Sequence, residues 1–148
     1  MIPALEQLLA YRHPGSIKNY MRTYGVDNLI AEELFIDMLK YLWVSTKHRS
    51  EVEHNPQDPS LQFNFVMHQE MRDIDNMWHG FILYTQDYMA FCDKFFGVYL
   101  HHVPDVAEGI TISDEEFATD MANYLSYIYD NLGEGTMRRW FSSVMENE

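Results

Sequence analysis

Apolar side chains recur at helical spacing along nearly the whole chain, and this periodicity constrains the fold more than any other feature of the sequence. Leu5, Leu8 and Leu9 form the first stripe, and runs that alternate strictly between apolar and polar residues, as strands do, are hard to find. The chain has 148 residues, a length that one hydrophobic core normally serves. We therefore predict an all-α fold, with a single compact helical domain over residues 1–148 and about six or seven helices.

Capping residues predict where the helices begin and end. Ser16 is the expected N-cap of a short helix that ends at Gly25. Asp27 is the expected cap of the next helix, which continues to about Lys47, and residues 49–65 are predicted to form a polar surface connection. The later predicted helices are 73–84, one capped by Thr85 that runs to Phe96, one that Ser113 begins and Gly133 closes, and a last one from about Thr136.

The charge is strongly negative and unevenly placed. The formal net charge is −13, and residues 75–148, with 13 acids and 3 bases, carry −10 of it. Such a surface repels phosphate, which argues against a nucleic acid or an anionic membrane as partner. A basic protein partner stays open, although a solvated acidic face is the simpler interpretation. Trp140 and Phe141 are expected either to fill the core or to form a contact in a homo-oligomer.

The sequence also predicts a compartment. No segment approaches the run of about 20 apolar residues that a spanning helix needs. The segment from Met1 to Glu6 lacks the basic start of a secretory signal, and Cys92 is the only cysteine, so no internal disulfide forms. These features favour a reducing cytoplasm and leave open export routes that read no amino-terminal signal.

The stretch from Met77 to Tyr84 is the first that suggests chemistry. Every residue in it is apolar or aromatic except His79 and Gly80, which predicts a buried helix. Asp75 lies four residues before His79, on the same helical face. We expect the Asp75 carboxylate to hold one nitrogen of a buried His79 imidazole while the other nitrogen points inward.

Further candidate ligands follow on the next helix and beyond it. Cys92 lies on the predicted inner stripe of its helix, and either His101 or His102 is expected to face inward. Imidazole and thiolate are ligands of zinc or iron, so His79, Cys92, His101 and His102 are the candidate metal ligands. His68 is a possible extra ligand. The residues expected to surround and orient a bound cofactor are Asp75, Trp78 and Tyr88.

Other interpretations of this cluster remain. The chain has no Cys-x-x-Cys and no His-Glu-x-x-His, so no spacing in it compels a metal. The alternative is that the cluster is purely structural and belongs to an acidic interaction module. A nucleophilic Cys–His pair is disfavoured, because burial among aromatic residues raises the pKa of a thiol. A metal-dependent enzyme with an open coordination position beside Tyr88 or Asp87 is a further alternative.

The block over residues 73–104 resembles a known set of sequences. Its ordered elements are Asp75-x-x-Trp78-His79, Tyr88, Phe91-Cys92, Phe96-Gly97 and His101-His102-x-Pro104. This order is similar to that of uncharacterised small bacterial proteins and, more distantly, of the amino-terminal region of plant glycine-rich domain-containing proteins. The resemblance implies a shared residue pattern and brings no enzymatic activity with it. Plant-like members often read Trp-His-x-His, and Phe81 stands here at the second His, which implies one donor fewer.

Overall fold

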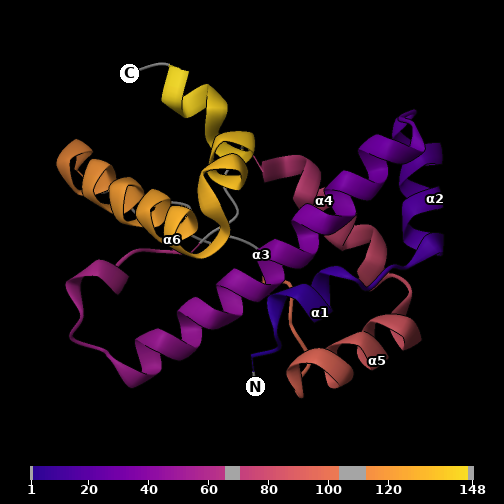
Figure 1. The fold of residues 1–148 in the computed structure, drawn as a ribbon, viewed down its shortest axis with the longest axis horizontal. Coiled ribbons are helices and arrows are strands. Elements are labelled where there is room, and N and C mark those ends of the chain that lie inside the picture. The colour runs from indigo at the N-terminus through magenta and orange to yellow at the C-terminus, as the bar shows by residue number, and fades with distance from the viewer. Residues whose placement is uncertain (1, 66–70, 104–112, 147–148) are drawn as a thin grey trace. The chain divides into compact units, whose positions relative to one another are not determined.

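All regular structure in the described part of the chain is helical. The computed structural model describes residues 2–65, 71–103 and 113–146, and within these ranges it contains six α-helices, one 3₁₀ helix and no strand. The predicted all-α class and helix number are therefore confirmed (Figure 1). The elements are α1 (Leu5–Leu9), α2 (Pro14–Tyr24), α3 (Asn28–His54), η1 (Pro59–Leu61), α4 (Arg72–Ile82), α5 (Thr85–Phe96) and α6 (Asp114–Glu146).

The chain divides into two compact units. The first unit joins Met1–Trp43 to Met71–His102, and the second joins Val44–Glu70 to Val103–Glu148. The predicted metal ligands within the described ranges all belong to the first unit. The extension of one domain over residues 1–148 stays a prediction.

Helix α2 begins differently from the prediction. His13, and not Ser16, is its N-cap, because the His13 side chain accepts a hydrogen bond from the Ser16 backbone N–H. Pro14 occupies the first turn, where its missing N–H costs nothing. The predicted end is confirmed, since Gly25 closes the helix with a left-handed φ of 66°.

Helix α3 confirms its predicted start and extends beyond its predicted end. Asp27 accepts a hydrogen bond from the Ile30 N–H at 2.9 Å, as a helix cap does. The helix continues past Lys47 to His54, so the prediction of a polar connection over residues 49–65 is wrong in its first part. The apolar stripe ends before the helix does, and polar residues that favour helices form its last turns. One ion pair in these turns joins Lys47 to Glu51, with an N···O distance of 3.6 Å.

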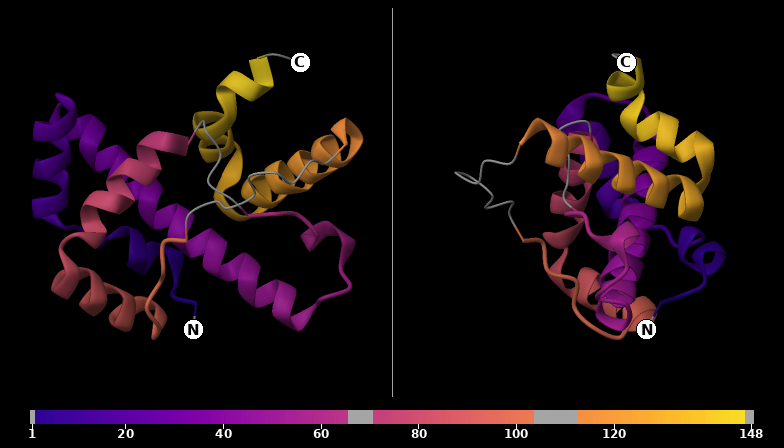
Figure 2. Two further views of the ribbon diagram at one scale, coloured as in Figure 1. Left: turned by 180° about the vertical axis from the view of Figure 1, so that it is seen from behind. Right: turned by 90° about the vertical axis from the view of Figure 1, so that its left-hand side faces the viewer.

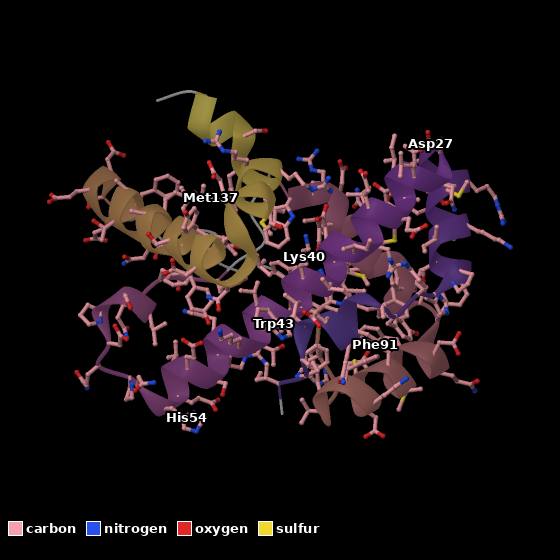
Figure 3. All side chains as sticks on the ribbon, in the orientation of Figure 1. Asp27, Lys40, Trp43, His54, Phe91 and Met137 are labelled. Carbon is pink, nitrogen blue, oxygen red and sulfur yellow. The ribbon has the colours of Figure 1, made fainter. Side chains whose placement is uncertain are left out.

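Aromatic rings fill the core of the first unit. Phe81 of α4 is fully buried and lies against Phe35 of α3 and Phe91 of α5, at centroid distances of 5.7 and 5.2 Å. Tyr11, between α1 and α2, adds a ring 4.9 Å from Phe91. Figure 3 labels Phe91 on α5. This cluster fixes the inner face of α4, the helix that carries Asp75 and His79.

Helix α6 dominates the second unit and is interrupted where the sequence predicts. Gly133 leaves helical geometry with φ 89° and ψ 168°, so the chain bends there before the helix resumes (Figure 2). Ser113 caps the start by accepting from the Glu116 N–H at 3.0 Å. Trp140 and Phe141 are buried, so the core alternative for this pair is the one observed.

His48 is a buried imidazole in the second unit. Its Nε2–H donates to the Leu61 carbonyl oxygen at 3.0 Å, and its ring packs 4.2 Å from that of Phe63. Burial lowers the pKa of His48, an effect that the bond to Leu61 opposes only in part. The folded chain therefore favours the neutral imidazole.

This lowered pKa predicts a pH-dependent stability. In the unfolded chain a histidine has a pKa of about 6.5, so below that pH the unfolded state binds a proton that the folded state resists. The contribution of His48 is complete above about pH 6.5 and is lost as the pH falls toward the lower, folded pKa. We expect His48→Gln to flatten the fall in unfolding free energy between about pH 7 and 5, measured by denaturant titration. An unchanged slope in the variant would contradict this.

Candidate functional site

A buried hydrogen-bonded chain links α4, α5 and the segment after α5. The Trp78 indole Nε1–H donates to the Tyr88 hydroxyl at 3.0 Å, and that hydroxyl donates to the Leu100 carbonyl oxygen at 2.6 Å. Burial raises the pKa of Tyr88, so the phenol keeps its proton. Gly97 turns the chain at the end of α5 with φ 71°. This arrangement brings His102 back to α4.

Helix α5 starts at the predicted place but without the predicted cap. Thr85 is its first helical residue, and the N-cap is Tyr84, whose side chain makes no capping hydrogen bond. The capping role expected of Thr85 is therefore wrong. Tyr84 instead donates from its hydroxyl to the Gly15 carbonyl oxygen at 3.2 Å.

Asp75, His79 and His102 form a cluster on the outer side of α4. Each offers one ligand atom, and the three atoms lie within 4.8 Å of one another. His102 Nε2–H donates to Asp75 Oδ1 at 2.5 Å, and His79 Nε2 lies 3.8 Å from the same oxygen. The two imidazole rings have centroids 4.2 Å apart, and the His102 ring also lies 4.4 Å from that of Trp78.

Two details of this cluster correct the sequence prediction. The His79 side chain is 55% exposed, so it is not the buried imidazole that the apolar run from Met77 to Tyr84 indicated. Helix α4 is amphipathic, because Met77, Trp78 and Phe81 face the core while His79 faces outward. Asp75 bonds to His102 rather than to His79, because the chain after Gly97 returns to the same face.

The structure separates the two adjacent histidines. The His102 side chain is 19% exposed and faces Asp75, whereas His101 is exposed and its ring stands 4.6 Å from that of Tyr99. The open choice between them is therefore decided in favour of His102 as the inner residue. His68 and Pro104 lie outside the described residues.

Cys92 lies apart from this cluster. It is 1% exposed in the core of the first unit and does not belong to the group of close donor atoms found among the described residues. Burial raises the pKa of its thiol, an effect that the Leu100 backbone and the Tyr88 side chain only partly oppose. Because a metal ligand must be the thiolate, this surrounding favours a structural cysteine.

The structure contains a second polar cluster, which the sequence analysis did not predict. His13 Nδ1 accepts from the Ser16 hydroxyl at 2.7 Å and from the Ser16 backbone N–H at 3.0 Å, so Nε2 carries the proton that is donated to Asp87 at 2.8 Å. The order Ser–His–Asp is that of a hydrolase triad. Here the same imidazole nitrogen caps α2, and Ser16 is buried, so the cluster joins α2 to α5. The spacing His13-x-x-Ser16 was its only signal.

We expect His13→Ala to lower the unfolding free energy by about 1–2 kcal/mol, because it removes both the cap of α2 and the link to Asp87. His13→Asn keeps an acceptor at the cap position and is the matched control. It should recover part of the loss in a denaturant titration. Equal stability of the alanine variant and the wild type would contradict the capping role.

The part of the chain that carries the Asp75 cluster matches the model of an uncharacterised family. This model, described as UCP032817-like, covers residues 60–119, a range that includes Asp75, His79 and His102. Searches of the curated proteins and of the solved structures each returned no match. The matched family thus brings no activity to the site, and the resemblance to the plant glycine-rich proteins stays a prediction. Among the described residues, no helix is both long enough and apolar enough to span a membrane.

Proposed function

We propose that this chain binds a transition-metal ion, zinc or iron, through Asp75, His79 and His102. The observation that supports this function is the convergence of one carboxylate oxygen and two imidazole nitrogens within 4.8 Å. Two histidines and one carboxylate are the donor set of non-haem iron sites and of many zinc sites. This assignment keeps His79 and His102 from the sequence prediction, moves Asp75 into the direct ligand set, and leaves Cys92 and His101 out.

The distances fit an ion after a small adjustment. Two ligand atoms that each lie about 2.1 Å from a tetrahedral zinc are about 3.4 Å apart. The 3.8 Å between His79 Nε2 and Asp75 Oδ1 is close to that span, while the 2.5 Å between His102 Nε2 and Asp75 Oδ1 is a direct hydrogen bond. An ion would take the place of the shared proton, and these two atoms would separate by about 1 Å.

Such a centre would have room for chemistry. Three protein ligands leave at least one coordination position for water or another oxygen donor. His79 is exposed, so solvent reaches this side of the cluster. The ion could then polarise a bound oxygen group, which keeps a metal-dependent enzyme among the outcomes without identifying its substrate.

The test is metal uptake by the purified chain. We expect near one equivalent of zinc or ferrous iron by elemental analysis and by calorimetric titration under anaerobic conditions. Cys92→Ala is the matched control, because it should retain the ion if Asp75, His79 and His102 are the ligands. If neither zinc nor iron binds in a near-stoichiometric amount, the proposal is overturned. If Cys92→Ala loses the ion, Cys92 belongs to the ligand set.

A second function is favoured by one observation, the contact of His102 with Trp78. Together with the bond to Asp75, this ring contact at 4.4 Å ties the segment after Gly97 to α4 without any ion. In that case the cluster is a structural element of an acidic module that binds a basic protein. Under this alternative His102→Ala lowers stability, and metal addition shifts the melting temperature of neither the wild type nor the variant.

A further inference from the structure

A groove of about 280 Å³ lies between α2 and α4 in the first unit, with His79 among its lining residues. Apart from Leu83, which directly follows α4, all of its lining residues belong to these two helices. Figures 1 and 2 show α2 beside α4. Because His79 also belongs to the candidate metal site, the groove and that site share a side chain.

The groove combines an apolar lining with an absence of formal charge. Tyr20 and Tyr24 of α2 present rings 4.4 Å apart, and Met77 and Leu83 add apolar surface. No Asp, Glu, Lys or Arg is among the described residues that line it, although the chain as a whole is strongly acidic. This composition suits an uncharged aromatic body far better than an ionic one.

Polar groups in the groove are available to orient a ligand. The side-chain amides of Asn19 and Asn76 make no hydrogen bond with any residue that the structure describes. Burial raises the pKa of Tyr20 to about 12, with smaller contributions from Asp73 and Tyr24, so its phenol remains a neutral donor. Amide and phenol groups of this kind fix the orientation of a small ligand by hydrogen bonds.

Gly80 of α4 lies at an open part of the groove. It lies inside α4 at helical φ, a position at which glycine costs stability relative to alanine. A Cβ atom there would meet nothing nearer than Asn19 Nδ2 at 3.9 Å, which is ordinary contact. Gly15, by contrast, would place its Cβ 3.2 Å from His13 and Tyr84. The groove therefore has free space at Gly80, and a long side chain placed there would enter it.

We propose that this groove binds a small aromatic molecule that carries one oxygen group capable of metal ligation, such as an aromatic carboxylic or hydroxamic acid. The ring lies among Tyr20, Tyr24 and Met77, the amides of Asn19 and Asn76 hold its polar atoms, and the oxygen group points past His79. The volume lies slightly below the usual range of ligand pockets, which limits the ligand to a small one. The contact between the oxygen group and the ion rests on the proposed metal site. The binding of the aromatic ring in the groove is independent of that site.

The test uses two probes and two matched variants. Benzohydroxamic acid carries a ring and two metal-ligating oxygens, and benzamide carries the ring and amide alone. Gly80→Leu fills the groove with a good helix former, and Ala90→Leu places the same side chain at an exposed position of α5. Binding is followed by the amide NMR signals of Asn19, Asn76 and Gly80, and metal affinity of every variant is measured separately by calorimetry.

We expect saturable shifts of these signals with benzohydroxamic acid on the metal-loaded chain, and weaker shifts with benzamide on the metal-free chain. Gly80→Leu should weaken both by at least about tenfold and leave metal affinity unchanged, while Ala90→Leu should bind both probes as the wild type does. Metal uptake without any probe-induced shift would overturn the groove proposal alone. If the chain takes up no metal but benzamide still shifts the NMR signals, the metal site alone is overturned. Equal probe binding by wild type and Gly80→Leu would also overturn the groove assignment.

Discussion

Replacing His102 with alanine is expected to lower the affinity for zinc or iron by more than about 100-fold, because even the loss of a residue that only orients a ligand costs about 10- to 100-fold. His102 supplies the least exposed nitrogen of the cluster, and its Nε2 already lies at Asp75 Oδ1. Without it, one imidazole and one carboxylate remain, a donor set too small to hold a transition metal tightly. Calorimetric titration of both proteins with each metal measures the difference.

His101→Ala is the matched control for this prediction. It removes a neighbouring imidazole from the same segment, but His101 is exposed and packs on Tyr99, away from the cluster. We expect it to keep the affinity of the wild type. A larger loss from His101→Ala than from His102→Ala would show that the two histidines exchange roles when the ion binds.

Local rules in the sequence were sufficient for much of the fold. The caps of Asp27 and Ser113 and the glycine ends at Gly25 and Gly97 are all observed, because each depends on residues within one turn of the helix end. The wrongly predicted cap of α2 reflects a competition between two partners. Ser16 could cap α2, but His13 does so because its imidazole is also held by Asp87, 74 residues away in the sequence.

The residues of the candidate site are among those that the sequence singled out, but their arrangement was not predicted. The spacing of Asp75 and His79 correctly places both on one face of α4, and the pair of His101 and His102 correctly supplies one inner residue. Helical spacing alone does not show which face of α4 is covered by the segment that follows Gly97. The turn at Gly97 and the bond between Tyr88 and Leu100 bring His102 to Asp75, while Cys92 stays in the core.

Replacing Phe81 with alanine is expected to lower the unfolding free energy by about 3–5 kcal/mol, the usual cost of removing a fully buried phenylalanine ring. Phe81 is 0% exposed, and its ring lies against those of Tyr11, His13, Phe35, Tyr88 and Phe91, at centroid distances between 5.1 and 6.1 Å. These neighbours come from α3, α5 and the connection between α1 and α2, so the cavity cannot close by the movement of one side chain. Denaturant titration measures the loss.

Leu83→Ala provides the control, since Leu83 follows α4 directly and is 79% exposed. Its stability should change by less than about 0.5 kcal/mol, as for a surface position. Phe81 also stands on the face of α4 opposite the exposed His79. Its removal should therefore lower stability without changing the metal stoichiometry of the molecules that stay folded. A Phe81→Ala protein that is as stable as the wild type would mean that this aromatic cluster does not hold α4 in place, and the geometry of Asp75 and His79 would then need another support.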